Sequence, residues 1–265
     1  MQLNLAEKLF NNFYNYGPRY LSHNVLSHIF PRPISGFPKY EKLVAGLSGL
    51  EIGGPSAVFK PGGLIPVYDR VGSLDSCNFG SETIWEGKLT PGRSFKFSTE
   101  KPPGIQFIGD TTFLIEIPNM HYDFLLSSHM LEHSANPIKA LREWRRVLKP
   151  RGSLILLLPN KRWTFDHRRP VTTLDHILSD FNANMGENDL THLPEILRLH
   201  DLARDKAAGT YEMFRARSER NFENRCLHHH VFDVPLVRQM LEYSGFVVRT
   251  LEEHFPNHIV AIAEV

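Results

Sequence analysis

Two histidines and a glutamate are crowded into five positions of the stretch "SSHMLEH", residues 127–133. His129, Glu132 and His133 are spaced i, i+3 and i+4, so they share one face of any helical turn. Imidazole and carboxylate groups suit a divalent cation, and three such ligands with an open position would make a catalytic site. The segment "LHHHVFD" (227–233) adds His228 and His230 as candidate ligands. One interpretation is therefore a metal site built from both segments.

The same side chains allow two other interpretations. Without a metal, His129 or His133 would serve as a general base that deprotonates a hydroxyl group. Alternatively, Glu132 and the histidines only orient a loop. The choice depends on the fold that surrounds them.

Alternating apolar runs and helical stretches from Leu50 onward are typical of a parallel α/β sheet. Between the fourth and fifth runs, Asn136 as N-cap and Pro137 at the first helical position begin an amphipathic helix. A second amphipathic helix spans 234–245, and the two runs after it are close enough to pair as an antiparallel hairpin. The predicted strands are 49–52, 63–69, 104–110, 122–128, 152–160, 246–253 and 258–265.

The charged stretch that begins at residue 160 carries few strand signals, and we expect two helices at about 191–207 and 209–222. We predict an N-terminal helical segment (1–48), a core (49–159 and 228–265) and an inserted cap (160–227) over the ligand-binding edge of the sheet. Arginine pairs well with carboxylate or phosphate, and an aromatic ring stacks on a sugar or another ring. Unless this loop is only a solvated charged surface, its candidate substrate-binding residues are Trp163, His167, Arg168 and Arg169.

The composition is that of an ordinary globular protein. The 265 residues suffice for one large domain with insertions, and the net charge of +1 shows no bias toward nucleic acid or membrane. Cys77 and Cys226 are too few for a disulfide framework, which favours a reducing compartment. We expect a cytoplasmic protein without a membrane span, and the oligomeric state stays open. Near the N-terminus, Leu5, Leu9, Phe10 and Phe13 fall at helical spacing.

Glycines and acids follow the first three predicted strands. Gly53 and Gly54 form a turn whose backbone N–H groups can approach a ligand closely. Asp69 lies 18 residues beyond Glu51, where an acid at a strand end can bind both hydroxyls of a ribose. Asp110 ends the third predicted strand in the same way and is placed to reach an adenine. Three such acids together favour a nucleotide-like cofactor.

The segments "LEIGGPS", "VYD", "GD" and "YDFLLSSHMLEHSANPIKALREWRRVLKPRGSLILLLPN", with the closing helix and hairpin, resemble class I S-adenosylmethionine-dependent methyltransferases. The likeness is to the small-molecule branch, in which "LEH", a helix and "LKPGG" recur. It implies a Rossmann-like, seven-stranded, mostly parallel sheet of order 3-2-1-4-5-7-6 with an antiparallel last strand. The implied contacts are Glu51, Gly53 and Gly54 at the methionine end, Asp69 at the ribose, Asp110 and Thr111 at the adenine, and Ser127 and Ser128 near the sulfonium.

The motif also resembles the metal-dependent O-methyltransferases of the ubiquinone pathway and of small-RNA 3′ ends, where "ExxEH" follows strand four. Here His129 replaces the first glutamate, which favours zinc, iron or manganese over magnesium. We therefore expect O-methylation of a small polar, sugar-like or natural-product acceptor, with S-adenosylmethionine as cofactor and metal assistance as an option. Pro55 and Ser56, where a third glycine is common, keep a catalytically inactive binding protein as an alternative. A nicotinamide-dependent oxidoreductase is the third reading, and the absent GxGxxG argues against it.

Overall fold

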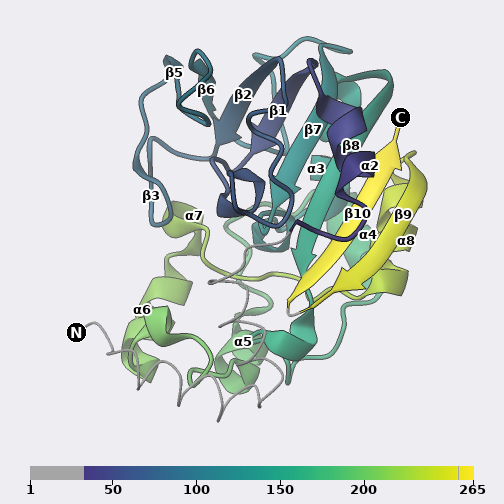
Figure 1. The fold of residues 1–265 in the computed structure, drawn as a ribbon. Coiled ribbons are helices and arrows are strands. Elements are labelled where there is room, and N and C mark those ends of the chain that lie inside the picture. Colours follow the sequence, from purple (N-terminus) through teal and green to yellow (C-terminus); the bar gives the residue numbers. More distant parts are fainter. Residues whose placement is uncertain (1–32, 256) are drawn as a thin grey trace.

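A twisted sheet of eight strands forms the centre of the molecule (Figure 1). The computed structural model describes residues 33–255 and 257–265, so the predicted helix around Leu5–Phe13 lies outside the described residues. The strands are β1 (Ser48–Ile52), β2 (Ser73–Asn78), β5 (Gly92–Phe95), β6 (Gly104–Ile108), β7 (Tyr122–Ser128), β8 (Leu148–Pro159), β9 (Val247–His254) and β10 (His258–Glu264). A separate short hairpin consists of β3 (Glu82–Thr83) and β4 (Gly87–Lys88).

The strand order is β5-β6-β2-β1-β7-β8-β10-β9. Without the edge strand β5, it is the expected order 3-2-1-4-5-7-6, so the Rossmann-like fold class is confirmed. β10 pairs antiparallel with both β8 and β9, which confirms the C-terminal hairpin. β5 pairs antiparallel with β6 and is an eighth strand that the sequence did not predict.

Helices cover both faces of this sheet because its central strands are apolar on both sides. On one face, α3 (Pro137–Val147) and α8 (Val234–Tyr243) pack against alternate leucines of β8. On the other face, α2 (Phe37–Val44) packs over Ile155 and Leu157. The predicted start of α3 is confirmed, since the Asn136 side chain accepts a hydrogen bond from the Lys139 N–H at 3.1 Å.

The prediction of a strand at 63–69 is wrong. Ile65, Val67 and Tyr68 are fully buried, but they belong to an irregular segment that packs under the sheet. The true second strand is β2. Its sequence is polar, and it fits inside the sheet because its polar side chains form hydrogen bonds within the protein. Asp75 accepts from the Ile105 N–H at 2.6 Å and from the Tyr122 hydroxyl at 2.8 Å. The apolar residues of segment 63–69 correctly indicated that it is buried, but they did not indicate whether it pairs as a strand.

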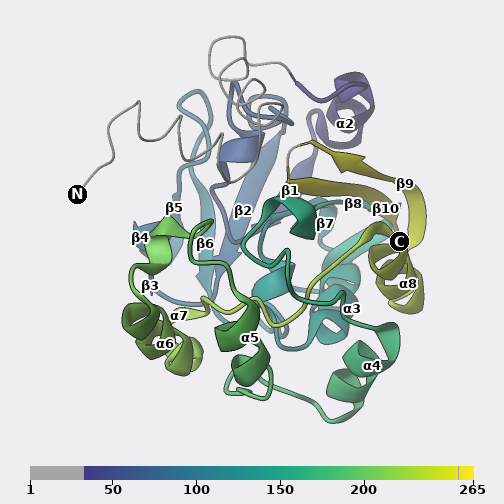
Figure 2. The same ribbon diagram turned by 90° about the horizontal axis from the view of Figure 1, so that it is seen from below.

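Residues 160–227, which we call the cap segment, contain helices and no strand. Figures 1 and 2 show α5, α6 and α7 below the sheet, at the end where β7 and β8 terminate. Helix α4 was not predicted, and the two expected helices are shorter than expected. The helices are α4 (Leu174–Asn182), α5 (Leu193–Leu199), α6 (Tyr211–Glu219) and α7 (Asn221–Asn224), with 3-10 turns at Lys161–Trp163 and Lys206–Ala208.

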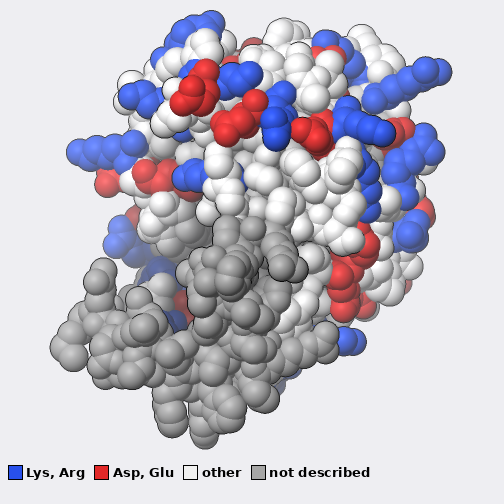
Figure 3. All heavy atoms as spheres, viewed as in Figure 1, with Lys and Arg blue, Asp and Glu red and all other residues white. Residues whose placement is uncertain are grey.

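The surface shown in Figure 3 mixes charges of both signs above the residues drawn in grey. Basic and acidic side chains alternate there, in agreement with the net charge of +1. Within residues 33–255 and 257–265, every helix is too short or too polar to cross a membrane.

Candidate active site

A cavity of about 800 Å³ lies at the carboxyl ends of the parallel strands, between the sheet and the cap segment. The register explains why several loops meet there. Ile52 pairs with both Cys77 and Ser127, so the residues that follow β1, β2 and β7 leave the sheet at one level. This is the edge at which open α/β sheets bind ligands. The core residues that line it include Gly53, Pro55, Ser56, Asn78, Asp110, Thr111, Ser128, His129 and Met130.

A buried carboxyl group shapes the glycine turn after β1. Glu51 is fully buried and accepts hydrogen bonds from the Ser56 N–H at 3.0 Å and the Tyr68 hydroxyl at 2.7 Å. Burial raises the pKa of Glu51 to about 7, although both hydrogen bonds oppose that rise. A Cβ on Gly54 would lie 2.3 Å from the Glu51 carboxyl carbon, so glycine is required there. Gly53 lines the cavity, whereas Glu51 and Gly54 support the turn from behind it.

Asp69 does not lie at this site, contrary to its expected ribose contact. It is exposed, it accepts a hydrogen bond from Ser98 Oγ at 2.7 Å, and it lies outside the cavity lining. The reason is the misassigned strand, because Asp69 precedes β2 instead of ending it. Asn78 ends β2 and lines the cavity, and its Nδ2 donates to the Gly54 carbonyl at 3.0 Å. The strand-end position expected for Asp69 therefore belongs to Asn78.

The remaining cofactor candidates divide between the cavity and the core. Asp110 and Thr111 line the cavity, and the Trp144 Nε1–H donates to the Thr111 carbonyl at 3.0 Å, which fixes this loop on α3. Ser128 also faces the cavity. Ser127 is fully buried and is absent from the lining, because successive residues of β7 point to opposite faces.

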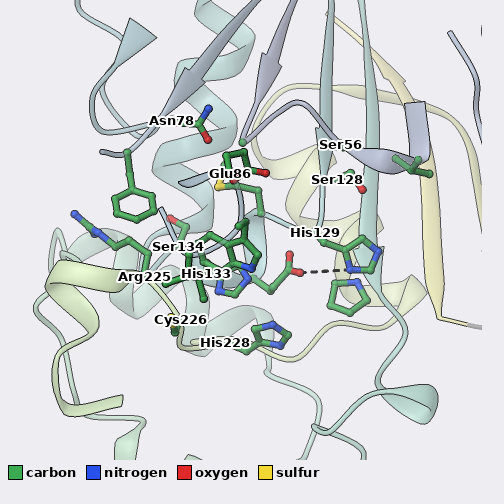
Figure 4. Close-up of a pocket in the computed structure, with 18 of the residues that line it drawn as sticks. Ser56, Asn78, Glu86, Ser128, His129, His133, Ser134, Arg225, Cys226 and His228 are labelled. Atoms are coloured by element: carbon green, nitrogen blue, oxygen red, sulfur yellow. Dashed lines mark ion pairs between the residues drawn. The ribbon is translucent and has the colours of Figure 1, made fainter. Parts of the chain in front are cut away.

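In the "HMLEH" stretch, the backbone of His129 is left-handed, and Leu131–His133 form a 3-10 turn. His129 has φ 52° and its Nε2 lies 2.8 Å from His258 Nδ1, while its Nδ1 lies 3.7 Å from Glu132 Oε1. The dashed line in Figure 4 marks the pair formed by His129 and Glu132. Burial lowers the pKa of His129 to about 4 and raises that of Glu132 to about 7. Glu132 Oε2 is buried, and no described residue gives it a hydrogen bond.

The structure brings three of the five candidate metal ligands together. Glu132, His133 and His228 each offer one ligand atom, and these atoms lie within 4.8 Å of one another. The His133 Nδ1–H donates to the Leu227 carbonyl at 3.1 Å, which leaves Nε2 as a lone-pair donor. His129 is turned toward His258 instead. His230 lies in a different group of side chains, so its expected place in this site is wrong.

An aspartate–histidine pair from the cap segment and the segment before α8 completes the site. His228 Nδ1 lies 2.5 Å from Asp166 Oδ2, so Nδ1 carries the hydrogen and Nε2 is the acceptor. His228 and Arg169 hold the pKa of Asp166 at about 2 despite its burial. Asp166 in turn raises the pKa of His228, although burial opposes this. Figure 4 shows His228 and His133 facing one another, with ring centres 4.7 Å apart.

The four predicted substrate-binding residues have different places. Trp163 lines the cavity. His167 and Arg168 lie outside the cavity lining and both pair with Asp201, at 2.8 and 3.1 Å. Arg169 is only 1% exposed and donates to Asp166, Glu195 and two backbone carbonyls, so it is a buried support. Phe165, whose ring was also expected to stack on a substrate, lines the cavity. The cap residues that line it and were not predicted include Arg204, Arg217 and Arg225, together with Trp85 and Glu86 from the β3–β4 hairpin.

Comparisons with known proteins agree with this architecture. Residues 93–156 match the model of a family described as a methyltransferase domain. No curated protein sequence matches the chain. An S-adenosylmethionine-dependent methyltransferase from Mesorhizobium loti is 13% identical, with a TM-score of 0.50 over 86% of this chain and 96% of the other. Another, from Aquifex aeolicus, is 14% identical, with a TM-score of 0.47 over 87% and 88% of the two chains. The likeness to the Mesorhizobium loti structure agrees with the Rossmann-like fold that the strand order shows.

Proposed function

We propose that this protein is an S-adenosylmethionine-dependent methyltransferase that methylates a hydroxyl group of a small polar, sugar-like or natural-product acceptor. The observation that carries the proposal is one cavity of about 800 Å³. It joins the loops after β1, β2 and β6 to His228, whose ring pairs with Asp166 behind the cavity lining. A volume of this size holds a cofactor and a small acceptor together.

The cavity residues fit the parts of such a cofactor. When bound, S-adenosylmethionine supplies an electrophilic methyl group on its sulfonium. Gly53 lets the backbone approach the methionine end, and Asn78 Oδ1 is the acceptor for the ribose hydroxyls, since Asn78 Nδ2 is engaged with Gly54. Asp110 and Thr111 receive the adenine, and Ser128, which lines the cavity above His129 in Figure 4, lies near the sulfonium.

The pair formed by Asp166 and His228 supplies the base for a hydroxyl acceptor. His228 Nε2 accepts the hydroxyl proton, and the ionised Asp166 stabilises the imidazolium that forms at Nδ1. His129 and His133 are poorer bases at neutral pH because burial lowers the pKa of both. The aromatic rings of Trp85, Trp163 and Phe165 line the same cavity, where they keep water from the reacting groups and offer stacking surfaces.

One observation favours a cation as a second route to the same reaction. The buried, unpartnered Oε2 of Glu132 lies in the group that also contains His133 and His228. A divalent ion held by these three residues would lower the pKa of the acceptor hydroxyl. On this route His228 is a ligand and cannot also be the base.

Methyl transfer from isotope-labelled S-adenosylmethionine to a panel of hydroxyl-bearing small molecules tests the proposal. We expect label in an O-methyl product with an equal amount of S-adenosylhomocysteine, and we expect it to persist after chelation if His228 is the base. Loss of activity on chelation, with restoration by a divalent ion in the unmodified protein but not in Glu132→Gln, would establish the cation route in the cavity. A protein that binds S-adenosylhomocysteine but labels no acceptor in the panel would support the inactive alternative.

A further inference from the structure

A second cluster of histidines lies outside the cavity, where the cap segment meets the segment that leads into α8. His176 and Asp180 are one turn apart on α4, and His192 is the residue before α5. His230 comes from the extended segment between α7 and α8 and is fully buried. One ligand atom from each of these four residues lies within 4.8 Å of all the others. The cluster thus joins three parts of the chain that are distant in sequence.

The distances inside this cluster are those of a tetrahedral ligand set. Zinc–nitrogen and zinc–oxygen bonds of about 2.0 Å require ligand atoms about 3.3 Å apart. His176 Nε2 lies 2.8 Å from His192 Nε2 and 3.3 Å from Asp180 Oδ2. His230 Nε2 lies 3.8 Å from the same oxygen. These three separations bracket the expected edge, and the other three are at most 4.8 Å, so a small contraction of the cluster would let the four residues hold an ion.

Polar atoms of the cluster residues are poorly satisfied: His230 Nε2 makes only a long hydrogen bond to the Ala135 carbonyl, at 3.4 Å. Asp180 Oδ2 is buried and accepts no hydrogen bond, and Nδ1 of His230 makes none either. A buried carboxylate oxygen without a donor is costly unless a cation or a proton satisfies it. His176 Nε2 and His192 Nε2 share one hydrogen bond at 2.8 Å, and a metal ion would replace the shared proton by binding both nitrogens.

A neighbouring carboxylate is placed to orient one of the ligands. Asp189 Oδ2 lies 3.5 Å from His192 Nδ1, on the opposite side of the ring from the cluster. Metal-binding histidines commonly direct their other ring nitrogen at such a carboxylate, which sets the ring orientation. Asp189 already accepts hydrogen bonds from the N–H and the hydroxyl of Thr191, at 2.9 and 2.8 Å. It is therefore an orienting group instead of a fifth ligand.

We propose that His176, Asp180, His192 and His230 bind a zinc ion that fastens the cap segment to the segment before α8. Three nitrogen donors and one oxygen donor in a closed tetrahedron suit zinc and leave no open position for catalysis. His230 is two residues from His228, so the ion would also hold the backbone that carries the proposed base. The zinc site does not depend on the proposed methyl transfer, and its test uses neither cofactor nor acceptor.

Titration of chelator-treated full-length protein with Zn²⁺ alone tests this site. Calorimetry should show one tight equivalent, and thermal unfolding should show a higher Tm with the ion. The variants His192→Asn and Asp180→Asn should bind at least about 100-fold more weakly and lose the Tm gain. The matched control is His167→Asn, since His167 also pairs with a cap aspartate but lies outside the cluster. It should bind Zn²⁺ like the unmodified protein.

Two further measurements separate this site from the cavity. In the double variant Glu132→Gln/His133→Asn, the tight equivalent should remain. Co²⁺ in place of Zn²⁺ should give the strong visible absorption of a tetrahedral complex, and His192→Asn should abolish it. No tight binding by the unmodified protein would overturn the proposal, as would unchanged binding by a folded His192→Asn. Loss of the equivalent in the double variant would place the ion in the cavity instead.

Discussion

Replacing His228 by alanine is expected to lower kcat for methyl transfer by about 10²- to 10⁴-fold, the usual contribution of a positioned general base. The affinity for S-adenosylhomocysteine should change little, because His228 comes from the acceptor side of the cavity. Asp166→Asn should also lower kcat, since an amide cannot stabilise the imidazolium and can present the wrong hydrogen-bonding group to Nδ1. The measurement is steady-state kinetics together with cofactor binding.

The pH profile distinguishes a base from a merely structural histidine. His228 accepts a proton only when it is neutral, so kcat/KM should fall as the pH drops through its pKa. That pKa is raised by Asp166, so the fall should begin above the usual histidine range. In Asp166→Asn the acid limb should move to lower pH. His121→Ala, at the opposite end of β7 from the cavity, is the control and should leave kcat and the pH profile of kcat/KM unchanged. Activity of His228→Ala within about threefold of the unmodified protein would remove His228 from the mechanism.

Replacing Arg169 by methionine is expected to destabilise the protein by about 3–5 kcal/mol, the cost of breaking a buried ion pair from one side. The loss would leave Asp166 as a buried charge with one partner fewer and would leave two carbonyls without their donor. Arg168→Met is the matched control, because its side chain is 54% exposed and pairs with Asp201. That change should cost at most about 1 kcal/mol.

Urea unfolding of the two variants measures this difference, and hydrogen exchange of the cap segment locates it. Because Arg169 ties residue 166 to the backbone of residues 228 and 229, faster exchange should concentrate in the cap segment and in the segment before α8. Equal destabilisation by both variants would contradict the assignment of Arg169 as a buried support. It would also reopen the earlier expectation that both arginines bind an acceptor.

Most of the sheet could be predicted from the sequence because central parallel strands are buried on both faces. The run "LILLLP" in β8 carries this signal, and so does "IVAIA" in β10, which is antiparallel but equally buried. β2 does not, since the half-buried Asp75 and the buried Ser76 are accommodated by side-chain hydrogen bonds that no local pattern reveals. The apolar segment before it was mistaken for the strand, and this error moved the ribose assignment from Asn78 to Asp69.

The candidate site could be predicted only where its residues are close in sequence. His129, Glu132 and His133 were found through their spacing, and Gly53 through its turn. The pairing of Asp166 with His228 joins residues 62 positions apart, and it depends on how the cap segment folds back. The separate destination of His230 has the same cause. Two residues from His228, its side chain groups with α4 residues instead of lining the cavity, because this segment is irregular and lacks the strand alternation that would place residues 228 and 230 on one face.

Titration of the unmodified protein with S-adenosylhomocysteine, beside Asn78→Leu and Asp69→Ala, tests the central claim that the cavity is a cofactor site. We expect the unmodified protein to bind one equivalent of S-adenosylhomocysteine and no NAD. Asp69→Ala should bind S-adenosylhomocysteine equally well, because Asp69 is exposed outside the cavity. Asn78→Leu should bind it about tenfold more weakly, as expected for loss of a neutral hydrogen-bond acceptor. Absence of S-adenosylhomocysteine binding would show that the cavity is not the cofactor site. Binding lost in Asp69→Ala and kept in Asn78→Leu would show that Asp69, and not Asn78, contacts the cofactor.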